Sequence, residues 1–318
     1  MKEIRPLDLS NVKRYPLSER KSKVSISDFS KSWSKGGSFR QWIETLPRIL
    51  AARELLEVRD RIIKAYRDKR PIILGMGAHP IKVGLSPIII DLMERGIITA
   101  IATNGASIVH DAEIAMIGKT SEDVGEQLRN GRFGLSEETG HFLNQAIRWG
   151  AERDMGLGQA IGKRIAESDF PYKEFSIFSN ALNLDIPITV HVAIGTDIIH
   201  IHPEVDGASI GKCSHRDFLI FSKLISDLDG GVFINLGSAV IIPEVFLKAL
   251  SLVRNLGYRV KDITTLTMDF IRQYRAMHNV VSRPTLEGGK GYYIVGHHEI
   301  MFPLLYASLI EAFGENEA

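Results

Sequence analysis

The sequence of 318 residues predicts an α/β fold with a doubly wound, mostly parallel sheet and helices on both of its faces. Short apolar runs alternate with longer helical patterns along most of the chain, which is the arrangement that builds such sheets. The pattern is clearest in residues 71–111, where apolar runs at 72–74 and 97–102 flank a helical run that Gly96 ends. Strand, helix and strand at this spacing form a βαβ unit, whose strands are parallel and whose connection is right-handed.

Composition divides the chain into an arm, one domain and a tail. Residues 1–38 are polar and irregular and are expected to form an N-terminal arm, within which 24–29 has the composition of an edge strand. Residues 39–313 are expected to form a single α/β domain. The helix-rich segment at about 118–185 is expected to be an insertion between the two sheet-forming halves of that domain. Residues 314–318 remain as a tail.

The helices follow from apolar spacing and from residues that start or stop helical turns. Residues 39–68 predict two helices that are separated at Pro47. The pair Ser86-Pro87 is typical of a helix start, with serine as the cap and proline in the first turn. The other helices are expected at 112–117, 136–153, 157–168, 173–183, 214–228 (capped by Ser214 and Asp217), 243–255 and 299–313, and the other strands at 186–194, 231–236, 262–268 and 292–295.

Composition also limits the function classes. The apolar content of 44%, the charged content of 24% and the net charge of +1 give no electrostatic case for nucleic acid or for an anionic membrane. The single cysteine, Cys213, excludes an intrachain disulfide and a cysteine-cluster metal site. The start of the chain has no apolar signal segment, and no apolar run reaches the ~18 residues of a membrane span. We therefore expect a cytoplasmic protein.

The loops after the predicted strands are candidates for a ligand site. Ligands of doubly wound sheets bind beyond the carboxyl ends of the strands. The loops 75–84 and 103–111 fall at this edge, and each is rich in glycine, small residues and polar groups. Backbone N–H groups there could hold a phosphate. Gly75 and Gly77 lack the third glycine of the dinucleotide fingerprint, and no P-loop lysine follows, so tight strand-to-helix turns are an equally open interpretation.

Histidines suggest a metal site as an alternative. His200 and His202 would point to the same face if they lay on a strand. Asp197, Glu204 and Asp206 are near in sequence, and imidazole with carboxylate suits Zn, Fe or Mn. The pair His297-His298 adds two more imidazoles, but the chain has no HExxH spacing.

Two residues are candidates for nucleophilic chemistry. Lys290 lies in a Gly-Gly-Lys-Gly loop, from which its amine could reach into a cleft and form an imine if it were partly desolvated. An ordinary surface lysine is the other interpretation. Cys213 follows Lys212 and precedes a helix start, although a small packed residue explains it as well. The chain has no G-x-S-x-G nucleophile elbow.

Four blocks of the chain carry a family resemblance. They are ILGMGAHPIKVGLSPIIIDLMERGIITAIATNGAS at 73–107, GGVFINLGSAVIIPEVFLKALSLVRNLG at 230–257, SRPTLEGGKG at 282–291 and GHHEIMFPLLYASLIEAF at 296–313. In order and spacing they resemble blocks of the deoxyhypusine synthase family. The resemblance implies a Rossmann-type NAD-binding topology. It also implies the family chemistry, in which NAD oxidises spermidine and a lysine imine carries an aminobutyl group to a protein lysine; close relatives make homospermidine.

The resemblance also implies roles for residues of this chain. Lys290 is expected to form or orient the imine, and His79 and His110 are candidate acid–base groups because imidazole titrates near neutrality. The expected cofactor-binding residues are Gly77, Ala78, Thr103, Asn104, Gly105, Asp111, Asp197, Gly237 and Ser238, and the expected substrate-binding residues are Glu287, His297 and His298. The family's paired glutamates fall on Val109 and His110. We therefore expect the unit to keep its architecture while the group that it binds has changed.

The expected function is that of a deoxyhypusine synthase-like transferase that binds NAD or a related nucleotide. Its substrate would be a polyamine or another small amine or guanidine, and a protein substrate is not favoured. The resemblance implies a homotetramer with sites between subunits. Two alternatives stay open, namely a non-catalytic oligomeric binding protein and a metal-assisted hydrolase that uses His79, His110, His200, His202 and His297.

Overall fold

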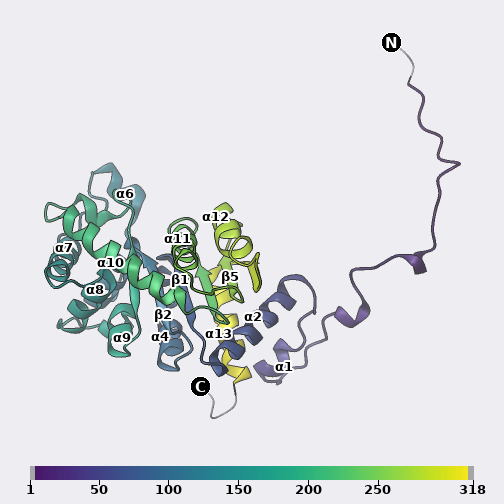
Figure 1. Ribbon diagram of the computed structural model, residues 1–318, viewed down its shortest axis with the longest axis horizontal. Helices are drawn as coiled ribbons and strands as arrows, with labels where there is room; N and C mark the ends of the chain where they lie inside the picture. Colours follow the sequence, from purple (N-terminus) through teal and green to yellow (C-terminus); the bar gives the residue numbers. More distant parts are fainter. Residues whose placement is uncertain (1–3, 314–318) are drawn as a thin grey trace.

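A computed structural model describes residues 4–313, which contain one sheet of six strands (Figure 1). The strands are β1 (Ile72–Met76), β2 (Ala100–Asn104), β3 (Ile188–His191), β4 (Val232–Leu236), β5 (Thr264–Asp269) and β6 (Lys290–Val295). Their order is β3-β2-β1-β4-β5-β6, and every neighbouring pair is parallel. The strand order reverses between β1 and β4, which makes that position the switch point of the sheet.

The sheet is embedded in helices, several of which belong to its crossover connections. The α-helices are α1 (Phe39–Ile43), α2 (Leu50–Arg67), α3 (His79–Lys82), α4 (Ser86–Glu94), α5 (Gly105–Ile117), α6 (Val124–Arg129), α7 (Glu137–Glu152), α8 (Leu157–Ala166), α9 (Ile177–Asn183), α10 (Gly207–Ser226), α11 (Ile241–Asn255), α12 (Tyr274–Ala276) and α13 (His298–Ala312). The short turns are η1 (Leu17–Glu19), η2 (Ile26–Asp28), η3 (Lys173–Phe175), η4 (Ile198–Ile201) and the π-helical η5 (Met277–Ser282).

Both faces of the sheet are buried. In β1, Leu74 and Met76 belong to a hydrophobic cluster shared with α2, α4, α5 and α13. Ile73 points to the opposite face and belongs to a second cluster shared with α10 and α11. This alternation follows from the period of two residues in a strand. A strand that is covered on both faces favours apolar residues along its length, which explains the continuous apolar runs in the sequence. The predicted doubly wound parallel sheet with helices on both faces is confirmed.

Some local predictions were right and others were wrong. Two helices flank Pro47, as expected. The segment 24–29 is not an edge strand, because Ser25 and Asp28 cap each other across η2 and close the backbone into a turn. Ser86 is the first residue of α4 and not its cap, and its hydroxyl has no hydrogen-bond partner within residues 4–313.

The region after β3 differs most from the expectation. The strand ends at His191, and His200 lies in the 3-10 turn η4, so it does not share a strand face with His202. Helix α10 begins at Gly207 and is capped by Asp206, whose carboxylate accepts the N–H groups of the first turn. Ser214 and Asp217 instead bond to the backbone of β3 from the side of α10.

The segment 118–185 is helical, with α6, α7, α8, α9 and η3 between β2 and the edge strand β3. The segment that precedes α1 extends away from the sheet in Figure 1. The tail 314–318 lies outside the described residues, and the division into arm, domain and tail stays a prediction. Within residues 4–313, no helix combines the length and the apolar character that crossing a bilayer would require.

Candidate functional site

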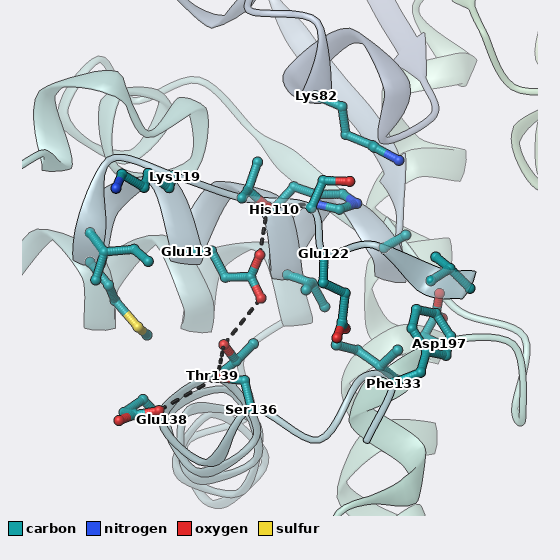
Figure 2. A pocket seen from close by; sticks show the side chains of 18 of the residues that line it. Lys82, His110, Glu113, Lys119, Glu122, Phe133, Ser136, Glu138, Thr139 and Asp197 are labelled. Atoms are coloured by element: carbon teal, nitrogen blue, oxygen red, sulfur yellow. Dashed lines mark hydrogen bonds between the residues drawn. The ribbon is translucent and has the colours of Figure 1, made fainter. Parts of the chain in front are cut away.

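The carboxyl edge of the sheet has two differently built regions. The first, which we call the pocket, is a cavity of about 790 Å³ beside α5 and the start of α7 (Figure 2). The second, which we call the crevice, lies at the switch point and contains Gly77, Gly237, Ser238 and His298. Parallel strands bring both regions to the same edge, where ligands of this fold class bind.

Helix α5 forms one wall of the pocket. Asn104 ends β2 and caps α5 by accepting the backbone N–H of Ser107, and Gly118 ends the helix in the left-handed conformation. The side chains that α5 turns toward the cavity include those of Ala106, His110 and Glu113. Their spacing of three and four residues places them on one face of the helix.

A chain of hydrogen bonds runs along this wall, as Figure 2 shows in part. His110 Nδ1 lies 2.7 Å from the hydroxyl oxygen of Thr120, and that hydroxyl lies 2.5 Å from Glu113 Oε2. The other carboxylate oxygen, Oε1, accepts the hydroxyl of Thr139 at 3.2 Å. Thr139 comes from the first turn of α7, so the chain joins α5 to the helical segment that closes the pocket.

His110 is held in its neutral form near neutral pH. Burial, and then the positive charge of Lys82, lower the pKa of His110 to about 4. Lys82 is the last residue of α3, and it points its amine toward His110 in Figure 2. A neutral imidazole has one nitrogen free to accept a proton, so His110 can act as a general base.

Asp197 occupies the amino end of α5. Its carboxylate packs against Gly105, where any side chain larger than hydrogen would collide with it, and it accepts the N–H of Ala106. Burial raises the pKa of Asp197. The amino end of a helix attracts anions, and here a side chain of the protein already supplies the negative charge. A phosphate therefore does not fit at α5, although Asn104, Gly105 and Asp197 were expected to hold the cofactor there.

The crevice is closed by backbone packing. Gly77 donates its N–H to the carbonyl of Leu236, and a Cβ added to Gly77 would lie 2.6 Å from the carbonyl oxygen of Gly237. Gly237 has φ +66°, and a Cβ there would lie 2.9 Å from the ring of His298. Both positions therefore need glycine.

Histidines and an aspartate line the crevice. The rings of His79 and His298 are 5.4 Å apart, and burial lowers the pKa of His298. Asp269 ends β5 beside them, and burial raises its pKa. His298 Nε2 lies 3.3 Å from the carbonyl of Met268 and therefore donates to it, which leaves Nδ1 as an acceptor. That Nδ1 is buried without a hydrogen-bond partner in the described part of the chain.

Two expected site residues lie at the opposite edge of the sheet. Lys290 is the first residue of β6, where its amine bonds to Glu57 of α2 and lies 4.9 Å from the ring centre of Tyr292. Five strand steps of about 3.3 Å separate this position from the carboxyl end of β6. Glu287 precedes β6 and pairs with Lys261 at 3.5 Å. Lys290 and Glu287 were expected to share a site with the histidines, and this prediction is wrong. The glycine-rich loop that carries them leads into the amino end of β6, whereas the histidines lie at the carboxyl edge of the sheet.

Asp111 and Thr103 have internal partners instead of a ligand. The carboxylate of Asp111 accepts the hydroxyl of Ser176 and, at 2.7 Å, the N–H of Ile177, and its exposed fraction is 0%. Burial raises the pKa of Asp111 to about 7, against the opposing effect of these bonds. Its expected contact with a cofactor is therefore wrong. Thr103 is also fully buried and bonds to the carbonyl of Met76.

The remaining expected residues are distributed around the two regions. Ala78 is almost fully buried next to His79, and His297 is exposed beside Glu299. Buried His202 faces the carbonyl of Gly134 at 2.9 Å. In residues 4–313, no three histidine, cysteine or acidic side chains gather in a way that could hold a metal ion. The metal-assisted alternative therefore finds no ligand set in this part of the chain.

Most of the residues that line the pocket are not among those predicted from the sequence. Lys82, Glu113, Thr120, Glu122 and Thr139 line it, and none of them was singled out. His110 was expected in the loop 103–111 and Glu113 in the helix after it, whereas both lie in α5, where a spacing of three residues puts them on one face. No local signal places Thr120 or Thr139 against Glu113, since those contacts depend on how the helical segment folds back.

Comparison with known proteins shows likeness at the level of structure. No family model matches the chain, and no curated protein matches it. The arginine dihydrolase ArgZ from the ornithine–ammonia cycle in cyanobacteria gives a TM-score of 0.51 at 17% identity over 82% of this chain. The ternary complex of AgrE with ornithine and NAD⁺ gives 0.52 at 16% identity over 86%. A putative deoxyhypusine synthase from Entamoeba histolytica gives 0.52 at 13% identity over 89%.

The extent of these matches differs. The chain spans 97% of the Entamoeba protein but only 32% of ArgZ and 34% of AgrE, so it corresponds to about a third of those two proteins. At identities of 13–17% the likeness shows a shared fold. The comparisons therefore agree with the parallel α/β architecture. A shared fold does not give a function, so the function must be inferred from the side chains of the site.

Proposed function

We propose that this protein is an enzyme that binds a small cationic amine or guanidine in the pocket and uses His110 as its general base. The observation that carries the proposal is the group of carboxylates around a neutral imidazole in one cavity at the carboxyl edge. Glu113, Glu122, Glu138 and Asp197 line the cavity, against Lys82 and Lys119. Four carboxylates against two ammonium groups favour a positively charged ligand.

The chemistry of His110 fits such a ligand. An ammonium group must lose a proton before its nitrogen or the adjacent carbon can react, and a neutral imidazole can take that proton. The proton would move from the substrate nitrogen to the free ring nitrogen of His110. The walls of the pocket would meanwhile hold the cation near the imidazole and limit access of water.

We propose that NAD or a related nucleotide binds in the adjoining crevice. When bound, NAD would supply a hydride acceptor for the carbon that bears the amine. The unpartnered Nδ1 of His298 is an acceptor that a ribose hydroxyl can satisfy. The AgrE complex with ornithine and NAD⁺, which has the same fold, supports this pairing of ligands.

Some parts of the family expectation are not carried forward. The proposal includes no lysine imine at Lys290, because that amine lies at the amino edge with Glu57. Assembly as a homotetramer stays part of the proposal, and light scattering of the purified protein tests it. A non-catalytic binding protein would show the same ligand binding without turnover.

The direct test is to incubate the protein with NAD and agmatine, putrescine, spermidine or ornithine and to follow NADH absorbance. We expect a burst with at least one amine and a loss of roughly 100-fold or more in rate for His110→Gln. His141→Gln is the matched control, because His141 is a half-exposed histidine on the outer side of α7. Absence of NAD binding by calorimetry would overturn the dehydrogenating proposal, and absence of binding by all four amines would overturn the pocket assignment.

A further inference from the structure

The hydrogen bonds that support His110 have a direction, and this direction fixes where its proton lies. Thr120 has a single hydroxyl proton, and it lies between His110 Nδ1 at 2.7 Å and Glu113 Oε2 at 2.5 Å. Glu113, as a carboxylate, can only accept hydrogen bonds. The proton of Thr120 must therefore go to Glu113, which leaves the oxygen of Thr120 to accept from the imidazole.

This arrangement determines the tautomer of His110. Nδ1 must carry the hydrogen, because it faces an oxygen that has no proton left to donate. In a neutral imidazole, Nε2 is then the nitrogen with the free lone pair. Nε2 has no hydrogen-bond partner within residues 4–313, and His110 lines the pocket.

The carboxylate is itself held from a second helix. Glu113 Oε1 accepts the hydroxyl of buried Thr139 at 3.2 Å, so the carboxylate cannot rotate without breaking a bond to α7. Each carboxylate oxygen thus has its own threonine donor. The two threonines hold Glu113 in the orientation that directs the proton of Thr120 away from His110.

We propose that Glu113 is a positioning residue that acts through Thr120 to hold His110 as the Nδ1–H tautomer, with Nε2 as the base that meets the ligand. This inference rests on the proposed function and adds residues to its site. When Nε2 takes a proton from the substrate ammonium, the Nδ1–H stays bonded to Thr120. The new positive charge on the ring is then stabilised by the carboxylate of Glu113 on the far side of the hydroxyl.

The test reads the tautomer directly and needs no substrate. The full chain is labelled with ¹⁵N-histidine, and long-range ¹H–¹⁵N spectra are recorded near pH 7, with His110 assigned from the His110→Gln variant. We expect a protonated Nδ1 and an unprotonated Nε2 in the wild type and in Thr120→Ser, which keeps the hydroxyl. In Thr120→Val the bond is lost, and we expect the Nδ1–H preference to give way to a mixture of tautomers.

Glu113→Gln provides a second variant with a different expected result. Its side-chain amide can donate to Thr120, which frees the hydroxyl proton for His110 Nδ1, so we expect the Nε2–H form to increase. Unfolding temperatures and the unchanged spectrum of His141 show whether the variants fold. A wild-type protein with Nε2–H at His110, or a Thr120→Val protein with the wild-type tautomer, would overturn the inference.

The result can be separated from the proposed function. If no amine is turned over but the tautomers behave as stated, the inference about Glu113 holds and the proposed reaction fails. If turnover is found, we expect Thr120→Val to lower kcat by roughly 10- to 100-fold with little change in KM, as when an outer partner of a functional histidine is removed. Thr120→Ser would restore most of that loss. Equal kcat in Thr120→Val and wild type would contradict a positioning role.

Discussion

The two halves of the carboxyl edge show how one parallel sheet can build an open site and a closed one side by side. The pocket, beside α5, is a cavity of about 790 Å³ lined by charged, polar and apolar side chains. The crevice, between β1 and β4, is closed by contact between the backbones of Gly77 and Gly237. The two regions differ in the segment that continues the chain after each strand. A thirteen-residue helix and a folded-back segment come after β2, whereas tight glycine turns come after β1 and β4.

The helical segment 118–185 closes the pocket against α5. Thr120, Glu122 and Thr139 all come from this segment, and they face α5. Within residues 4–313, no comparable helical segment covers the crevice. Of its two histidines, His79 is exposed and His298 is buried. In the proposed function, the amine is selected by the pocket and the nucleotide binds at the crevice.

The largest expected effect concerns His191, at the end of β3 in the pocket half. Burial lowers the pKa of His191 to about 3, from an ordinary value of 6.5. Below pH 6.5 His191 is protonated in the unfolded chain but stays neutral in the folded chain. The free energy of unfolding therefore falls as the pH is lowered from 6.5 toward 3. The loss at the acid end is on the order of several kcal/mol.

Urea denaturation of wild type and His191→Phe over this range measures the effect. We expect a flatter pH dependence in the variant. Asp111 and Asp217, whose pKa values burial raises to about 7, stabilise the fold as the pH falls, but they are present in both proteins and cancel in the difference. Equal slopes for the two proteins would show that His191 is protonated in the fold.

The next effect tests the closed half. Gly77→Ala places a methyl group against the backbone of Gly237, which cannot give way as a flexible side chain would. We expect the free energy of unfolding to fall by about 1–3 kcal/mol. Gly211→Ala is the control, because Gly211 lies in α10 with open space around it and alanine there should stabilise the helix by up to ~1 kcal/mol. Equal melting temperatures for Gly77→Ala and wild type would mean that the crevice is not closed.

A smaller effect tests the charge of the open half. Asp197→Asn removes one negative charge from the pocket while keeping a side chain that can cap α5. We expect the affinity for agmatine to fall roughly 10-fold, about 1.4 kcal/mol. Asp185→Asn makes the same change in an exposed position just before β3, at the amino edge, and should leave the affinity unchanged. A similar loss in both variants would point to a general effect of charge.

The smallest effect concerns the amino edge. The pair between Lys290 and Glu57 is partly exposed, so Lys290→Ala should lower the free energy of unfolding by at most about 1 kcal/mol. Because Lys290 lies away from both regions, amine binding and turnover should match the wild type. Lys261→Ala, which breaks another exposed pair near the same edge, is the control. A large loss of turnover in Lys290→Ala alone would restore the imine expectation.

The sequence predicts the sheet better than the site, for physical reasons. Residues 72–74 are apolar throughout and residues 232–236 are apolar except for Asn235, because β1 and β4 are covered on both faces, and this burial is visible as a pattern. Lys290 was expected at the carboxyl edge, but it begins β6 at the amino edge. A glycine-rich loop has the same sequence signature whether it precedes or follows a strand. Thr120 and Glu113 were missed because seven residues of sequence do not reveal that the chain turns back after Gly118.

Asp111 and Asp197 illustrate the same limit. Both are acidic and come after predicted strands, so both were expected to face a cofactor. The structure uses Asp111 to hold the start of α9 and Asp197 to hold the start of α5. A carboxylate that caps a helix and one that binds a ligand have the same sequence signature, and only the packing around them separates the two.

The measurement that tests the central claim most directly is a calorimetric titration of agmatine into wild type, Ala106→Phe and Ser136→Trp. Ala106 of α5 and Ser136, just before α7, both line the pocket, so either enlarged side chain should fill it. We expect one binding site per chain in the wild type, and its loss in both variants while the unfolding temperature stays close to that of the wild type. Binding that persists unchanged in both folded variants, or no binding to the wild type, would contradict a cationic ligand in the pocket.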